Sequence, residues 1–204
     1  MPKGLFISFE GGEGAGKTTL IDSLYEKLKA LNYQIVKTFE PGGTEVGDKV
    51  RDVLLFSEDV SPFCELGLFL ASRAEHVTKV IKPAIDQCKI VLCDRFSDST
   101  IAYQGIAREL GKKKIEDLCQ IFSNSLNPDI TFYLDIDPIV GLQRQEALEK
   151  DRIESEKLDF HKIVRKAFLQ LADENQKRIH VLDAAGEKLE VFEKALNKIL
   201  SYLS

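Results

Sequence analysis

Residues 5–20, LFISFEGGEGAGKTTL, join an apolar run, a glycine cluster and the start of a helical leucine pattern. The run from Leu5 to Phe9 is typical of a buried strand, and leucines from Leu20 to Leu28 recur at the spacing of one helix face. Between them, residues 11–18 match G-x-x-x-x-G-K-[ST], the pattern of a phosphate-binding loop (P-loop), in the strand-loop-helix context that it requires. We therefore expect phosphate binding at the start of this helix.

The residue types of the loop suit this chemistry. Glycines let backbone N–H groups turn inward around a phosphate, and the helix N-terminus adds partial positive charge. Lys17 is expected to reach the β- and γ-phosphate oxygens, and the Thr18 hydroxyl to ligate Mg²⁺. A glycine-rich turn without a ligand is the alternative, but its inner glycines would have no packing purpose. We expect a nucleoside triphosphate to bind at Gly11, Gly12, Glu13, Gly14, Ala15, Gly16, Lys17, Thr18 and Thr19.

Further strands are expected along the chain, with helical patterns between them, at residues 34–39, 90–93, 130–134 and 179–182. This alternation predicts a parallel sheet in a three-layer α/β domain, which binds ligands at the carboxyl edge of its strands. Asp94 directly follows one of the apolar runs, so we expect it to hold the metal through water. Capping the next helix is its alternative role, and the two roles are compatible.

Composition limits the class of protein. The length of 204 residues and 44% hydrophobic content, without a linker, predict a single domain over residues 1–204. A net charge of -5 argues against a general binder of nucleic acid or of membranes. No apolar window is long enough for a membrane span or a secretory signal, so we expect a cytoplasmic protein. Buried thiols, rather than a zinc site, are expected at Cys64, Cys88, Cys93 and Cys119.

A second group of residues suits a phosphorylated acceptor. Arg51, Arg73 and Arg95 follow expected strands or lie on the next helices, and guanidinium groups bind phosphate or a base carbonyl through paired donors. Phe69 lies four residues before Arg73 on one helix face, where an aromatic plane beside a donor fork can hold a pyrimidine. A core phenylalanine and a surface ion pair are the alternative.

The charged stretch at residues 143–156, which contains Arg144 and Arg152, lacks apolar periodicity. A solvated helix face is the ordinary explanation of such a run, and a mobile lid is the more specific one.

Five stretches, taken together, resemble one known family, the bacterial thymidylate kinases of the nucleoside monophosphate kinase group. They are FEGGEGAGKTT at 9–19, EPGGT at 40–44, FLASR at 69–73, DRFSDSTIAYQ at 94–104 and DRIE at 151–154. The resemblance implies a P-loop fold with a five-stranded parallel sheet, a short lid and a homodimer. It also implies transfer of the γ-phosphoryl group of ATP, with Mg²⁺, to thymidine 5′-monophosphate (dTMP), giving dTDP for dTTP biosynthesis.

The same resemblance implies roles for individual residues. Glu13 matches the carboxylate that senses the sugar 3′-hydroxyl, and Tyr103 the residue that excludes a ribose 2′-hydroxyl. The lid departs from the family pattern, because it has fewer arginines than relatives with an acidic P-loop residue. Acceptor phosphate is assigned to Arg51 and Arg95, base stacking to Phe69, a base carbonyl to Arg73, other base contacts to Ser99 and Gln104, adenine stacking to Arg144, and catalysis to Lys17, Arg95 and Arg152.

Two alternatives stay open on the sequence. One is a kinase for another small acceptor, such as uridylate, cytidylate or a deoxynucleoside. The other is a P-loop switch or regulatory ATPase that hydrolyses ATP without an acceptor, because such proteins share the same loop.

Overall fold

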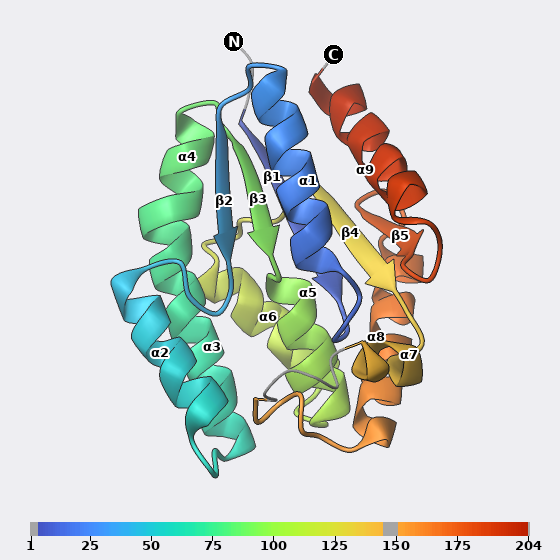
Figure 1. Ribbon diagram of the computed structural model, residues 1–204. Coiled ribbons are helices and arrows are strands. Elements are labelled where there is room, and N and C mark those ends of the chain that lie inside the picture. Colours follow the sequence, from blue (N-terminus) through green and yellow to red (C-terminus); the bar gives the residue numbers. More distant parts are fainter. Residues whose placement is uncertain (1–3, 145–150, 204) are drawn as a thin grey trace.

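The computed structural model describes residues 4–144 and 151–203 as a parallel sheet between two layers of helices (Figure 1). Within these ranges the sheet has five strands in the order β2-β3-β1-β4-β5. All the strand pairs are parallel, as the alternation of strands and helices predicts. The strands are β1 (Leu5–Gly11), β2 (Ile35–Phe39), β3 (Ile90–Asp94), β4 (Ile130–Asp135) and β5 (Ile179–Asp183).

Helices cover both faces of this sheet. One face packs against α1 (Lys17–Ala30) and α9 (Lys188–Leu203), which Figure 1 shows side by side in front of the strands. The other helices lie on the opposite face or pack against helices that do, as α2 packs on α3 and α7 on α8. They are α2 (Glu45–Phe56), α3 (Pro62–His76), α4 (Lys82–Asp86), α5 (Ser97–Thr100), α6 (Lys112–Phe122), α7 (Pro138–Gln143) and α8 (Leu158–Glu174), with π-helical turns η1 (Val77–Ile81) and η2 (Ile101–Ala107).

The core lies on both sides of the central strand. Every residue of β1 is buried, because the strand has neighbours on both edges and helices on both faces. Ile7 and Phe9 pack toward α1 and α9, whereas Phe6 packs toward α4 and η1. These two cores fix the carboxyl end of β1, from which the P-loop begins.

Two expectations differ in part from the structure. The helical pattern from Pro62 predicts one long helix to about Cys88 with a kink at Pro83. The π-turn η1 breaks this helix directly before Lys82 and Pro83, close to the predicted kink. Proline has no N–H to donate, so a wider turn there costs no hydrogen bond. Of the four cysteines, Cys64 and Cys88 are exposed, on the first turn of α3 and in the turn after α4; Cys93 and Cys119 are buried.

In the described ranges, no helix has the length and apolar character needed to cross a membrane. The expected lid, residues 143–156, falls partly outside these ranges, because residues 145–150 are not described.

Candidate active site

A cavity of about 1170 Å³ opens at the carboxyl ends of β1, β2 and β3. The P-loop and α1 line one part of it, and α3, α5 and η2 line another. The structure thus brings most of the expected triphosphate and acceptor residues to one cavity. Those lining it are Glu13, Gly14, Ala15, Gly16, Lys17, Thr18, Thr19, Arg51, Phe69, Arg73, Asp94, Arg95, Ser99, Tyr103, Gln104 and Arg144.

The P-loop backbone is shaped by its glycines. Gly16 caps α1 with a φ of 86°, in the left-handed region that glycine tolerates best, and a Cβ atom added there would meet no atom within 4 Å. At Gly14 an added Cβ would lie 2.1 Å from the carbonyl oxygen of Gly141 on α7. The front of the loop is therefore open, while its back is in close contact with α7.

Lys17 is buried at the first residue of α1. Its Nζ donates to the carbonyl oxygens of Gly11 at 3.1 Å and Gly12 at 3.2 Å. Burial and the nearby charge of Arg95 lower the pKa of this ammonium group. An anionic ligand at the loop would supply the countercharge that this site favours.

The oxygen groups near Lys17 suit a divalent cation. Asp94 Oδ1 is a buried atom without a hydrogen-bond partner among the described residues, and the helix that follows begins after Phe96, so Asp94 does not cap it. Thr18 is exposed on the first turn of α1. A carboxylate and a hydroxyl are hard oxygen donors, as Mg²⁺ prefers. No group of three or more His, Cys, Asp or Glu side chains that could hold a metal ion occurs among the described residues.

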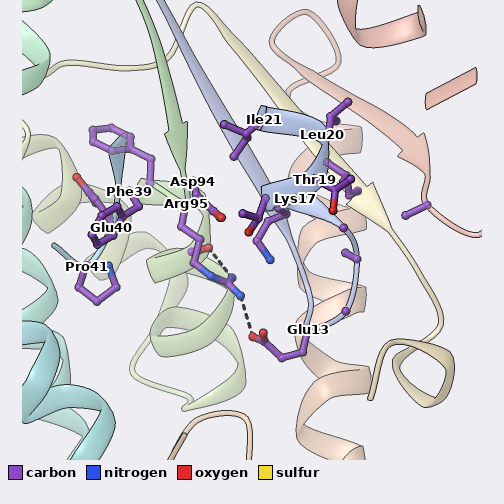
Figure 2. A pocket seen from close by; sticks show the side chains of 18 of the residues that line it. Glu13, Lys17, Thr19, Leu20, Ile21, Phe39, Glu40, Pro41, Asp94 and Arg95 are labelled. Atoms are coloured by element: carbon purple, nitrogen blue, oxygen red, sulfur yellow. Dashed lines mark hydrogen bonds and ion pairs between the residues drawn. The ribbon is translucent and has the colours of Figure 1, made fainter. Parts of the chain in front are cut away.

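Glu13 and Arg95 point toward one another beside the P-loop (Figure 2). Arg95 Nη2 donates to Glu13 Oε1 at 2.7 Å, and its Nη1 reaches Ser99 Oγ at 3.2 Å and Tyr103 Oη at 3.4 Å. Burial alone would raise the pKa of Glu13, but the charges of Arg95 and Lys17 hold it below its usual value. The P-loop is thus joined by a charged pair to the expected acceptor residues.

Glu10, which sequence reasoning missed, holds the segment that follows Arg95. Its carboxyl group accepts from the Phe96 N–H at 2.8 Å and from Ser99 Oγ at 2.5 Å; both residues follow Arg95, whose φ is 67°. Burial and the nearby charge of Asp98 raise the pKa of Glu10 to about 8. The only signal in the sequence was an acidic residue at the end of an apolar strand.

Arg73 is almost fully buried, and its partners were also missed. Its Nε donates to Glu40 Oε2 at 2.8 Å, while His76 Nδ1 lies 2.9 Å from the other oxygen of Glu40. The ion pair expected as an alternative therefore exists, but it lies in the interior rather than on the surface. Phe69, one turn earlier on α3, is half-buried and lines the cavity.

Arg51 lies on α2 near the end of β2. Its Nη1 donates to the Pro41 carbonyl oxygen at 3.0 Å, and its guanidinium lies 5.4 Å from the centre of the Phe39 ring. Figure 2 shows Phe39 and Pro41 on the side of Arg95 away from the P-loop.

The two arginines of the expected lid have different surroundings. Arg144 Nη1 donates to the carbonyl oxygens of Gly14 at 3.3 Å and Ala184 at 3.2 Å, at the edge of the cavity. Arg152 donates instead to Glu65 Oε2 at 2.7 Å and to the Leu54 carbonyl oxygen at 3.1 Å. It is not among the described residues that line the cavity.

The π-helical turn η2 places two consecutive residues, Tyr103 and Gln104, on the cavity wall. Tyr103 is 5% exposed and packs edge-on against Phe160 and Phe168 of α8. The wider turn of a π-helix, often found at functional sites, changes which side chains share a face. A sequence pattern based on 3.6 residues per turn does not reveal it.

The chain is similar to known proteins along most of its length. The family model of thymidylate kinase matches residues 9–195. The thymidylate kinase of Protochlamydia amoebophila is 46% identical over 205 residues, covering 95% of this chain and 91% of that protein. That of Pelobacter propionicus is 45% identical over 206 residues, covering 97% and 94%. The crystal structure of thymidylate kinase from Ehrlichia chaffeensis matches with a TM-score of 0.80 at 35% identity, covering 97% of this chain and 99% of that one.

Proposed function

Because the chain belongs to the thymidylate kinase family, we infer that it transfers the γ-phosphoryl group of ATP to dTMP, giving dTDP and ADP in the biosynthesis of dTTP. One observation of the fold supports this inference most directly. The P-loop and the pair Phe69 and Arg73 line the same cavity, so a triphosphate and a pyrimidine nucleotide can meet within it.

The main contribution of such a cavity to catalysis is to align the donor and acceptor phosphates. Phosphoryl transfer passes through a loose transition state, and little covalent chemistry is left to the protein. Orienting donor and acceptor can supply about 7 to 11 kcal/mol of the barrier. The acceptor phosphate is already anionic, so we assign no general base.

On the donor side, we assign the phosphates of ATP to the P-loop N–H groups and to Lys17. We assign the adenine contact to Arg144, whose guanidinium bridges the P-loop and Ala184. Mg²⁺ would be held by Thr18 and, through water, by Asp94. When bound, the cation neutralises phosphate charge and orients the reacting oxygens.

On the acceptor side, we assign the phosphate of dTMP to Arg51 and Arg95 and the base to Phe69, Arg73, Ser99 and Gln104. Glu13 would accept from the sugar 3′-hydroxyl. Tyr103 would exclude a 2′-hydroxyl, because its ring packs against Phe160 and Phe168 and lines the cavity.

For the lid, residues 143–156, we propose closure over ATP, which excludes water that would otherwise hydrolyse it. Arg152 would then leave Glu65 and stabilise the transferring phosphoryl group. This assignment requires a change in the contacts of Arg152, since its guanidinium now bonds to Glu65 and Leu54.

We also propose a cytoplasmic homodimer that uses the surface of α2, α3 and α6. Large apolar side chains are exposed there, including Phe56 at 74%, Phe63 at 60% and Ile121 at 70%. Light scattering of the purified protein tests this: a dimer that Phe63→Glu converts to a monomer supports it, and a monomeric native protein contradicts it.

Product identification tests the function. The protein is incubated with ATP, Mg²⁺ and an equimolar mixture of dTMP, dUMP, UMP, CMP and thymidine, and products are identified by mass spectrometry. We expect dTDP as the main product. A different phosphorylated product would favour another kinase, and ADP formed without an acceptor would favour an ATPase.

A further inference from the structure

Glu65, on the first turn of α3, is a buried carboxylate to which the proposed reaction assigns no role. Its side chain is only 1% exposed. It accepts hydrogen bonds from three residues of other elements: Gln104 Nε2 at 2.8 Å, Arg152 Nη2 at 2.7 Å and Arg108 Nη2 at 3.3 Å. Glu65 therefore joins a residue of the cavity wall to two cations outside it.

These partners keep Glu65 ionised. Burial alone would raise its pKa, but the hydrogen bonds from Gln104 and Arg152 and the charge of Arg108 lower it below the usual value of a glutamate. An ionised carboxylate can only accept hydrogen bonds. Whatever faces Glu65 must present a donor.

This requirement fixes the orientation of the Gln104 amide. The amide has one donor end and one acceptor end, and Glu65 takes the donor end. Gln104 lines the cavity, and no other partner of its side chain occurs among the described residues. Its oxygen, Oε1, is therefore the atom offered to a ligand.

We propose that Glu65 is a positioning residue for base selection, because it makes Gln104 an acceptor and so favours pyrimidines that carry an N3–H over cytosine. Thymine and uracil have a hydrogen on N3, whereas N3 of cytosine has none and would face the amide oxygen with a second lone pair. The inference rests on the proposed function, since it places the base of a nucleoside monophosphate between Phe69 and Gln104.

Glu65→Gln is the variant that tests this orientation. Arg152 and Arg108 donate through Nη2 to Oε2 and have no acceptor, so the carbonyl oxygen of the new amide would take the Oε2 position. Arg108 Nε, which lies 3.4 Å from Oε1, would lose that weaker contact. The NH₂ group of the new amide would then face Gln104, whose oxygen would turn to accept from it. Gln104 would thus offer its own NH₂ to the base, which suits N3 of cytosine and opposes N3–H of thymine.

The measurement is kcat/KM for dTMP and for dCMP, expressed as a ratio. We expect Glu65→Gln to lower the ratio of dTMP to dCMP by about tenfold or more, the effect of a mismatched buried polar pair. A change at Arg152 would act on both acceptors alike and cancel in the ratio. The matched control is Glu156→Gln, which removes the other carboxylate that pairs with Arg108 but has no bond to Gln104; its ratio should equal that of the native protein.

A second measurement needs no substitution. Native protein is assayed with N3-methylthymidine 5′-monophosphate, in which a methyl group replaces the hydrogen that Gln104 would accept. We expect kcat/KM to fall by at least about tenfold relative to dTMP. If Glu65→Gln does not fold, Glu65→Asp takes its place, since a shorter carboxylate reaches Gln104 poorly and should shift the ratio in the same direction.

The outcomes separate the two proposals. Normal dTMP turnover with an unchanged ratio in the Glu65 variant, or equal use of the N3-methyl compound, would overturn the role of Glu65 and leave the proposed function intact. Absence of dTMP turnover in the native protein would overturn the proposed function and this inference with it.

Discussion

Glu13 Oε1 and Arg95 Nη2 lie 2.7 Å apart, which joins the P-loop to the end of β3 within the cavity. The two residues are far apart in the sequence, and the parallel pairing of β1 with β3 brings them together. Each has further partners on the acceptor side, where Tyr103 Oη lies 3.5 Å from Glu13 and 3.4 Å from Arg95. A ligand that binds one of these side chains therefore changes the surroundings of the other.

Replacement of Lys17 by Ala should reduce kcat by orders of magnitude. The variant removes the one side-chain cation of the P-loop among the described residues, and with it the charge stabilisation of the transferring phosphoryl group that we assign to Lys17. Steady-state kinetics with ATP and dTMP measure the loss, and circular dichroism confirms folding. Unchanged turnover would rule out the role of Lys17.

Tyr103→Ala should narrow the preference for deoxyribose over ribose acceptors. The ring lies against Phe160 and Phe168, so its removal leaves space that a 2′-hydroxyl can enter. The measurement is kcat/KM for dTMP divided by that for ribothymidine 5′-monophosphate. Tyr103→Phe, which keeps the ring, is the control and should keep the ratio; an equal ratio in the alanine variant would contradict the steric role.

Arg152→Ala should depress kcat far more than the affinity for dTMP, if the side chain serves the transition state. Arg108→Ala is a matched control, because Arg108 also pairs with Glu65. Loss of a contact to Glu65 alone would affect both variants to a similar degree. If Arg152→Ala weakens only dTMP binding, the transition-state role belongs to another residue.

The raised pKa of Glu10 predicts that the free energy of unfolding falls as pH rises from about 5 to 8. The pKa of Glu10 is raised to about 8 in the folded state, above the ordinary value of 4.5. In this interval the unfolded chain has released the proton that the folded chain keeps, so the free energy of unfolding decreases with pH. Glu10→Gln cannot titrate and should remove on the order of 3 kcal/mol of this decrease. Urea unfolding at pH 5.5 and pH 8 measures it, with the exposed Asp22→Asn as control.

Gly141→Ala should destabilise the protein by about 1 to 3 kcal/mol and raise the KM for ATP. An added Cβ would lie 2.3 Å from the carbonyl oxygen of Glu13, so the P-loop would have to shift. Gly67→Ala is the control, because that exposed position on α3 has no atom within 4 Å of an added Cβ. The free energy of unfolding of Gly67→Ala should rise by about 0.5 to 1 kcal/mol, because alanine favours a helix more than glycine does. Equal melting temperatures for the two variants would contradict the close contact.

The sequence predicted the features that depend on local pattern. The apolar runs of β1, β3 and β4 are continuous because these strands are covered on both faces. The glycines of the P-loop indicate a backbone conformation that other residues rarely adopt. The parallel sheet and the meeting of its carboxyl ends follow from these elements.

The burial of acidic side chains could not be predicted from the local sequence pattern. Glu10, Glu40 and Glu65 look like ordinary charged residues in the sequence, and their burial depends on arginines and backbone donors from distant segments. The π-turns were missed as well, because a sequence pattern based on 3.6 residues per turn does not show them.

The contact between Gly14 and Gly141 also constrains how this protein can change. Neither position has space for a side chain unless the opposite backbone moves, so mutations in the P-loop and in α7 should show strong epistasis. In a library that randomises both positions, surviving clones should keep glycine at both, and a larger residue at one should be rescued only by remodelling of the other segment.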